Sequence, residues 1–303
     1  MDDRITRRDA LARLAIGAAA SSLMGCAPDP TPTVTPAPAS GGLPPAGPAA
    51  PRHTYGTEAS QFGELSLPKG DGPHPVAIAI HGGFWRSEYD LTHLRSLCAA
   101  MAEAGWAVWS VEYRRVGEEG GGWPNTLLDV ASAADHLRTL APAHRLDLAR
   151  VVSIGHSAGG HLALWLAARK RIAAGHALHS GNPLPLRAAV SLAGVSDLRM
   201  AHQLRLGGGA VERLLGGGPE TFPDRYAGAS PAELLPLGTP QVLVHGTDDT
   251  AVPVEISRAY RTAAVAKGDS VELLELEGED HFALIDPNSL AWPSVRGALK
   301  RFR

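Results

Sequence analysis

Stretches of apolar residues alternate with amphipathic stretches from about residue 53 to the end of the chain. Continuous apolar runs such as 76–80 are typical of strands that are covered on both faces, and the stretches between them have helical spacing. The alternation predicts an α/β fold with a mostly parallel central sheet and helices on both faces. Strands are expected at 58–67, 76–80, 107–111, 151–154, 188–192, 241–244 and 271–276, and helices at 91–104, 125–140, 157–170, 254–267 and 292–301.

The segment 196–235 interrupts this alternation. It contains glycine triplets at 207–209 and 216–218 and several prolines, a composition that predicts short helices joined by turns. Because the segment lies between two expected strands, we interpret it as a small cap over one end of the sheet, with a plain surface excursion as the alternative. The body of the chain, 53–303, is therefore expected to form one domain that carries this cap.

Composition narrows the classes of function. The formal net charge of the chain is -3, which leaves no basic surplus for a nucleic-acid backbone. Cys98 lies among apolar residues at helical spacing, which favours a buried structural cysteine over a catalytic one. The cysteines and histidines do not have the spacing of a zinc site, and no phosphate-binding glycine loop follows the first strand, so neither a metal nor a cofactor is expected.

Residues 1–26 have the pattern of an export signal. Arg4, Arg7 and Arg8 precede an apolar stretch at 14–24, which is shorter than the roughly 20 residues that a membrane-spanning helix needs. A positively charged start followed by a short apolar stretch is typical of such signals. A chance amphipathic N-terminus is the alternative.

The end of this signal resembles the lipobox of bacterial lipoproteins. The residues Leu-Met-Gly-Cys at 23–26 match that motif, in which the signal is cut before the cysteine, so that Cys26 would carry the lipid. The stretch Thr-Arg-Arg-Asp-Ala-Leu at 6–11 resembles a twin-arginine signal. Met24 and Ala10 depart from the two patterns, and a plain cleaved signal is the alternative.

Residues 27–52 are dominated by proline, alanine, threonine and glycine. Such a segment buries too little apolar surface to order itself, and proline keeps it extended. We interpret it as a tether between the lipid on Cys26 and the body of the chain. The sequence thus predicts an exported protein whose body lies outside the cytoplasm and whose contact with a bacterial membrane is made only through a lipid anchor.

The pentapeptide Gly-His-Ser-Ala-Gly at 155–159 has the form G-x-S-x-G. In a sharp turn from strand to helix, this motif strains the serine and lifts its hydroxyl above the sheet, while the glycines avoid a collision between the two elements. The pentapeptide alone is a weak signal. An expected strand leads directly into it and an expected helix leads out, which makes Ser157 the candidate nucleophile.

A glycine-containing loop, His-Gly-Gly-Phe-Trp at 81–85, follows the first buried strand. Small residues there allow backbone N–H groups to approach the carbonyl of a substrate and to stabilise a developing oxyanion. The expected donors are the N–H groups of Gly83, Phe84 and Ala158. A glycine turn without a catalytic role is the alternative.

The candidate acid and base follow later strands. Asp248 and Asp249 lie after the strand at 241–244, and the spacing Asp-x-x-Val-Pro favours Asp249 as the carboxylate that orients the base. Asp248 is then expected to cap a turn or to face solvent. His281 lies on the loop after the last expected strand, the place of the general base. Other histidines near these motifs are expected to pack or to brace loops: His81, His156, His161 and His245.

Together these residues resemble the α/β-hydrolase superfamily over about 53–303. The loop at 81–85 and the stretch Gly-His-Ser-Ala-Gly-Gly-His at 155–161 are similar to the branch of kynurenine formamidases and related carboxylesterases, which includes feruloyl-esterase-like and hormone-sensitive-lipase-like enzymes. Glu-Tyr-Arg-Arg at 112–115 and Trp-Pro at 123–124 match further positions of that branch. The resemblance implies acyl transfer to a serine without a cofactor.

The chain departs from the lipase-like pattern at Phe84, where a third glycine is usual, and at 116–119, where an acidic motif is replaced. Because the chain carries an export signal, we expect it to hydrolyse a carboxylic ester of a small molecule, with formamide hydrolysis as the alternative. Phe84, Trp85 and Trp123 are candidates for the lining of an acyl or aromatic pocket. A catalytically silent binding lipoprotein on the same fold is a remote alternative.

Overall fold

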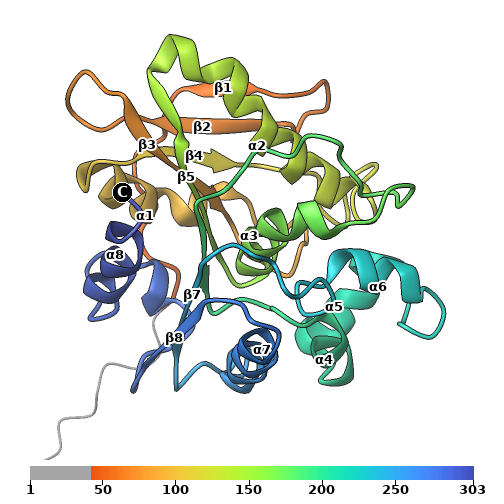
Figure 1. The fold of residues 1–303 in the computed structure, drawn as a ribbon. Helices are drawn as coiled ribbons and strands as arrows, with labels where there is room; N and C mark the ends of the chain where they lie inside the picture. Colours follow the sequence, from red (N-terminus) through yellow and green to blue (C-terminus); the bar gives the residue numbers. More distant parts are fainter. Residues whose placement is uncertain (1–41) are drawn as a thin grey trace, which may run out of the picture. The chain divides into compact units, whose positions relative to one another are not determined.

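The computed structural model describes residues 42–303, and an eight-stranded sheet lies at its centre (Figure 1). The order across the sheet is β1-β2-β4-β3-β5-β6-β7-β8. From β4 to β8 neighbouring strands are parallel, whereas β1 and β2 join one edge in antiparallel pairings. The strands are β1 (Arg52–Thr54), β2 (Phe62–Ser66), β3 (His74–Ile80), β4 (Ala107–Val111), β5 (Leu146–His156), β6 (Ala188–Leu192), β7 (Gln241–Gly246) and β8 (Val271–Leu276).

Helices cover both faces of the sheet, which confirms the predicted architecture (Figure 1). Apolar residues of α2, α3 and α7 share one core with the sheet, and those of α1 and α8 share the other. The helices are α1 (Arg95–Glu103), α2 (Asn125–His144), α3 (Ala158–Ala168), α4 (Leu198–Gln203), α5 (Leu206–Leu215), α6 (Pro223–Ala229), α7 (Glu255–Ala266) and α8 (Trp292–Lys300), with 3-10 turns η1 (Leu91–Leu94), η2 (Arg169–Arg171) and η3 (Ala283–Ile285).

Strands β3, β4, β6 and β7 are buried along their whole length because each of their faces meets a different core. In β3, Val76, Ile78 and Ile80 belong to the core beneath α2 and α3. Ala77 and Ala79, which alternate with them, belong to the core beneath α1 and α8. Side chains alternate across a strand, so a strand covered on both faces is apolar at every position, and this is why its sequence shows a continuous run.

Segments with weaker apolar patterns differ from the expected elements. The strand expected at 151–154 extends over Leu146–His156, and its polar first half pairs with the start of β3 across a register shift. The helix expected at 125–140 continues to His144 and ends at Arg145 in a left-handed conformation, with φ of 51°. The short edge strand β1 has no apolar run and was not expected from the sequence.

The cap segment forms the short helices α4, α5 and α6, as its composition predicts. The glycine triplet 207–209 has left-handed backbone at every position, with φ between 56° and 84°, a conformation that glycine adopts at little cost. The cap lies against α3. The indole of Trp165 donates to the carbonyl of Gly228 at 2.9 Å, so α3 is covered by the sheet on one side and by the cap on the other. For this reason α3 is buried at every residue.

The export signal at 1–26 and the first part of the expected tether lie outside the described residues. The last part of that tether, 42–51, rests on the body. Pro44 is buried, and Leu65 in β2 donates its N–H to the carbonyl of Pro51 at 3.0 Å. Within residues 42–303, no helix has the length and apolar character needed to cross a membrane.

Candidate active site

Ser157 lies in the turn between β5 and α3 with φ of 57° and ψ of -119°, a conformation that is costly for a residue with a side chain. Close approach of two elements explains the flanking glycines. A Cβ atom on Gly155 would lie 2.1 Å from the carbonyl oxygen of Gly159, and one on Gly159 would lie 2.0 Å from that of Ile80. The turn is fixed by a hydrogen bond from Ser157 N–H to the carbonyl of Leu192 at 2.8 Å. The motif is therefore a steric requirement of this turn.

The structure brings His281 and Asp249 together from the loops after β8 and β7. The Nδ1 atom of His281 lies 2.6 Å from Oδ2 of Asp249, and both side chains are buried. The other carboxylate oxygen of Asp249 accepts from the N–H groups of Ala251 and Val252, both at 2.8 Å. With Nδ1–H donated to the carboxylate, Nε2 of His281 is free to accept a proton. Asp248 is exposed.

A second histidine contacts the same carboxylate. Nε2 of His245 lies 3.2 Å from Oδ2 of Asp249, and its Nδ1 lies 2.7 Å from the hydroxyl of Ser257. Burial raises the pKa of Asp249, but the hydrogen bonds from His245 and His281 and from the Val252 N–H outweigh it and hold this pKa below its usual range. His245, expected only to brace a loop, thus helps to keep Asp249 ionised.

His156, the variable residue of the serine motif, packs beside the candidate base. Its ring centroid lies 4.4 Å from that of His281, and its Nε2 donates to the main-chain carbonyl of His281 at 2.9 Å. Burial, together with the neighbouring His281 and His93, lowers the pKa of His156 well below its ordinary value. A neutral, fully buried imidazole of this kind positions its neighbour rather than accepting a proton.

The loop at 81–85 lies against the serine turn. A Cβ atom on Gly82 would lie 2.9 Å from Cβ of Ser157. The consecutive residues Gly83, Phe84 and Trp85 have φ of 103°, 51° and 57°, so the backbone turns through left-handed conformations that are strained for the two aromatic residues. Such strain gathers at functional sites because the surrounding packing must hold it in place.

The candidate oxyanion donors lie on the two segments that meet at Ser157. The N–H groups of Gly83 and Phe84 donate to no backbone carbonyl within residues 42–303. Ala158 is the first residue of α3, so its N–H has no acceptor inside the helix. The N–H of Gly82 is occupied, because it donates to Nε2 of His93 at 3.2 Å. Burial, with a smaller effect of neighbouring charge, lowers the pKa of His93 to about 3, so this acceptor nitrogen stays unprotonated.

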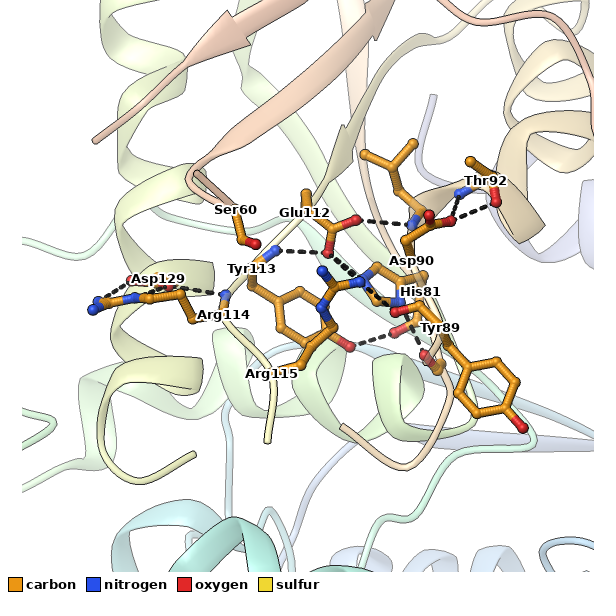
Figure 2. A network of polar contacts seen from close by, with 12 residues as sticks. Ser60, His81, Tyr89, Asp90, Thr92, Glu112, Tyr113, Arg114, Arg115 and Asp129 are labelled. Carbon is orange, nitrogen blue, oxygen red and sulfur yellow. Dashed lines mark hydrogen bonds and ion pairs between the residues drawn. The ribbon is translucent and has the colours of Figure 1, made fainter. Parts of the chain in front are cut away.

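A buried carboxylate supports the start of this loop (Figure 2). Glu112 follows β4 and lies 2.8 Å from Nε2 of His81, 3.2 Å from the guanidinium of Arg115 and within 3.1 Å of the N–H groups of Leu91 and Tyr113. The hydroxyl of Tyr113 donates to the carbonyl of His81 at 2.9 Å, and the two rings are stacked. The loop is therefore held from the end of the neighbouring strand.

The two arginines of the motif at 112–115 extend this support in two directions (Figure 2). Arg115 donates to the carbonyl of Tyr89. A Cβ atom added to Gly83 would lie 2.4 Å from Cβ of Tyr89, so Tyr89 packs directly against the loop. Arg114 forms two 2.8 Å hydrogen bonds with the carboxylate of Asp129 in α2. No role was expected for 112–115 from the sequence, and the structure shows that these residues join the loop at 81–85 to α2.

Ser157 and His281 line one small cavity with a volume of about 70 Å³. Pockets for drug-sized ligands are several times larger, typically about 300–1,000 Å³, so this cavity has room for a group of only a few atoms. Most of its wall is apolar or aromatic. The other lining residues are Leu43, Gly83, Phe84, Tyr89, His93, His156, Ala251 and Phe282.

Of the aromatic residues expected at the pocket, only Phe84 lines it. Trp85 is fully buried and packs edge-on against His161, with 5.2 Å between the ring centroids. The left-handed backbone of the loop directs neighbouring side chains to different sides. Trp123 lies against the cap, where its backbone N–H donates to the carbonyl of Leu214 at 2.8 Å. The expectation that Trp85 and Trp123 line the pocket is corrected accordingly.

Other residues at the site were not expected to line it. His93 and Leu43 line the cavity, although neither lies in a recognisable motif. Phe282 does so because it follows His281 directly, and adjacency to the base was the available signal. Within residues 42–303, the histidines, cysteines and carboxylates form no group of three or more that could hold a metal ion. Cys98 is buried in the core, and burial raises the pKa of its thiol to about 12.

Comparison with known proteins identifies a family model and two curated proteins that are similar to this chain. The BD-FAE family model matches residues 64–263. Esterase LipC of Mycobacterium tuberculosis is 30% identical over 226 residues, which are 71% of this chain and 54% of LipC. Esterase LipQ of the same organism is 27% identical over 218 residues, 68% of this chain and 50% of LipQ. The chain thus spans about half the length of the curated relatives it matches.

Solved structures share the fold. A truncated carbohydrate esterase from gut microbiota superposes with a TM-score of 0.72 at 20% identity, covering 84% of this chain and 96% of that one. The propionate-bound esterase Est2 of Thermogutta terrifontis gives a TM-score of 0.67 at 24% identity, covering 84% and 93%. The fold of residues 42–303 is that of the α/β-hydrolases.

Proposed function

Because the chain belongs to the BD-FAE family, an esterase family of the α/β-hydrolase type, we propose that it is a serine carboxylesterase with Ser157, His281 and Asp249 as its catalytic triad. The observation that carries this proposal is the placement of Ser157 and His281 in one cavity, with Nδ1 of His281 2.6 Å from Asp249. A serine needs an adjacent base to become nucleophilic, and the base needs an orienting carboxylate.

In the first half of the reaction, Nε2 of His281 accepts the hydroxyl proton of Ser157 while Oγ attacks the ester carbonyl carbon. The carbonyl oxygen becomes negative and accepts hydrogen bonds from the N–H groups of Gly83, Phe84 and Ala158. Each such donor is worth about 3 kcal/mol in the transition state. His281 then gives its proton to the leaving alcohol as the C–O bond breaks, which leaves an acyl group on Ser157.

In the second half, a water molecule attacks the acyl carbon and transfers a proton to Nε2 of His281. When the bond to Oγ breaks, Ser157 recovers that proton and a carboxylic acid is released. Asp249 remains ionised throughout, because its hydrogen bonds keep its pKa below the usual range. Its role is to hold the Nδ1–H tautomer and to stabilise the imidazolium.

The size of the cavity supports a short acyl group. A cavity of about 70 Å³ beside Ser157, Phe84 and Phe282 favours an acetyl group over an extended chain. A formyl group is smaller still, so the same observation supports formamide hydrolysis as a second candidate. Turnover of N-formylkynurenine compared with 4-nitrophenyl acetate and a feruloyl ester separates the two. A kcat/KM highest for the formamide would replace the ester proposal.

The test of the enzyme proposal is hydrolysis of 4-nitrophenyl acetate by the wild type and by Ser157→Ala. We expect the variant to lose about 10⁶-fold in kcat, as loss of a serine nucleophile does elsewhere. Ser270→Ala is the control, because Ser270 is exposed and precedes β8, at the other end of the parallel strands. Wild type and Ser157→Ala that are equally inactive on a panel of esters and amides would contradict the proposal and favour a binding protein.

We also propose that Cys26 is acylated and anchors the exported body to a bacterial membrane. Residues 1–26 lie outside the described residues, so this rests on the lipobox and on the basic, apolar start of the chain. Cys26→Ala is expected to move the protein from the detergent phase to the aqueous phase in Triton X-114 partitioning, whereas Cys98→Ala is not. Partitioning unchanged by Cys26→Ala would contradict a lipid anchor.

The route of export has its own test. Replacing Arg7 and Arg8 together by lysine is expected to block export if the twin-arginine route is used, and to leave it unchanged if the general route is used. The readout is the amount of protein outside the cytoplasm.

A further inference from the structure

The segment that precedes β1 follows a fixed path over the body. The hydroxyl of Ser96, at the start of α1, donates to the carbonyl of Pro45. A Cβ atom on Gly47 would lie 2.7 Å from the carbonyl carbon of Arg95, so this part of the segment lies in contact with the same helix turn. Pro44 is buried. The contacts at Pro45 and Gly47 hold the segment against α1, which a free tether would not require.

The path of this segment ends at the candidate active site. Leu43, next to the buried Pro44, lines the cavity that contains Ser157 and His281. Its side chain is 46% exposed, so it lies at the outer part of the cavity, between solvent and the interior.

Leu43 differs from the parts of the cavity wall that adjoin the candidate chemistry. Gly83 and Phe84 carry candidate oxyanion donors, and Phe282 adjoins the base. These positions are constrained by the geometry of the reaction. Leu43 lies in none of the loops that carry these groups and belongs to neither apolar core. It can therefore set the size of the cavity without supporting the chemistry.

We propose that Leu43 is a specificity-determining residue, whose side chain at the outer part of the cavity limits the length of the acyl chain. The proposal rests on the esterase function above. Replacing leucine by alanine removes three carbons from the wall of a cavity of about 70 Å³, which leaves room for a longer acyl chain. Each additional methylene that becomes buried is worth roughly a fourfold gain in kcat/KM, the fold equivalent of its transfer from water.

The experiment compares kcat/KM for the 4-nitrophenyl esters of acetate, butanoate and hexanoate in the full chain. Leu43→Ala is expected to raise the ratio of hexanoate to acetate about tenfold. Leu43→Trp is expected to lower the same ratio. Ser96→Ala, which removes the bond to Pro45, is expected to shift the ratio in the direction of Leu43→Ala but by less.

Leu67→Ala is the matched control. Leu67 is 45% exposed, nearly the same as Leu43, but lines a different cavity beside Lys69 and Arg303. Its replacement should leave the acyl-chain profile unchanged. A wild-type profile in Leu43→Ala, or an equal fall on all three esters, would overturn the proposal for Leu43 while the esterase proposal stands. A wild type that is inactive like Ser157→Ala would instead overturn the esterase proposal.

Discussion

His156 donates a hydrogen bond from Nε2 to the main-chain carbonyl oxygen of His281 at 2.9 Å. The residue before the candidate nucleophile thus holds the backbone of the candidate base. The serine turn and the loop after β8 come from distant parts of the chain, and this bond fixes the distance between them. It also fixes the tautomer of His156, because the carbonyl can only accept.

Replacing His156 by alanine should lower both activity and stability. The buried carbonyl of His281 would lose its donor, which typically costs about 1–3 kcal/mol in the free energy of unfolding. A small displacement of the base should lower kcat by tenfold or more. Urea unfolding and 4-nitrophenyl acetate hydrolysis measure the two effects. His156→Gln keeps an N–H donor and should recover part of each loss, and an alanine variant with wild-type kcat would contradict a positioning role.

Asp249→Asn should lower kcat by about 10⁴-fold while the protein stays folded. An amide in place of the carboxylate favours the wrong tautomer of His281 and does not stabilise the imidazolium. Asp248→Asn is the control, because Asp248 is the adjacent residue of the same type and its side chain is exposed. Hydrolysis of 4-nitrophenyl acetate is the readout. A large loss in Asp248→Asn with none in Asp249→Asn would exchange the roles of the two aspartates.

Stability should fall below pH 6.5 in part because of His161. Burial lowers the pKa of His161 from 6.5 to about 4, and its Nε2 lies 2.9 Å from the carbonyl of Ala229 in the cap. A lowered pKa means that the unfolded chain binds the proton more readily. This contribution is therefore fully present above pH 6.5 and is lost as the pH falls towards 4.

His161→Gln should make the free energy of unfolding less sensitive to pH. At roughly 1.4 kcal/mol for each pKa unit, the loss in the wild type between pH 8 and pH 5 should exceed that in the variant by about 2 kcal/mol. Urea unfolding at the two pH values measures the loss in each protein. Other buried histidines contribute equally to both losses, so their contributions cancel when the two losses are subtracted. Equal losses in the two proteins would mean that His161 is not buried in a neutral state.

Glu112→Ala should destabilise the protein by about 3–5 kcal/mol, the typical cost of removing one member of a buried ion pair. The carboxylate is buried, and its loss removes the acceptor that Nε2 of His81 and the N–H groups of Leu91 and Tyr113 share. Arg115 loses one of its acceptors and keeps Glu118. Glu272→Ala is the control, because Glu272 pairs with Arg301 at an exposed position, where such a pair is worth about 1 kcal/mol or less. Urea unfolding of the two variants separates the cases, and equal effects would contradict a supporting role for Glu112.

The architecture could be predicted because strands that are buried on both faces appear in the sequence as runs of apolar residues. The strands β4 and β6 begin and end at the expected residues, since each is a largely apolar, buried run. The strand β8 also has the expected bounds, although it contains Glu272 and Glu275. The chain order of serine, acid and base limited the candidates further, because each follows a strand of a parallel sheet. The structure brings the expected base and carboxylate within 2.6 Å of each other.

The remaining features depend on contacts and backbone angles that leave no periodic pattern. His245, near the end of β7, contacts Asp249 in the segment that follows this strand, and His93 contacts Gly82 from a separate turn. The position of Trp85 in the core follows from its left-handed backbone. Tryptophan rarely adopts this conformation, so the sequence does not predict it. The placement of Leu43 is of the same kind, since a segment rich in proline and alanine predicts no contact at all.

Leu43 also bears on how such an enzyme changes over evolutionary time. It belongs to neither apolar core and is half exposed, so most substitutions there should cost little in folding. The range of acyl groups can then change through mutations at position 43, which selection for stability restricts little. The strained turns at Ser157 and Phe84 allow no such freedom. With the role proposed for Leu43, substrate range and foldability are inherited through separate parts of this chain.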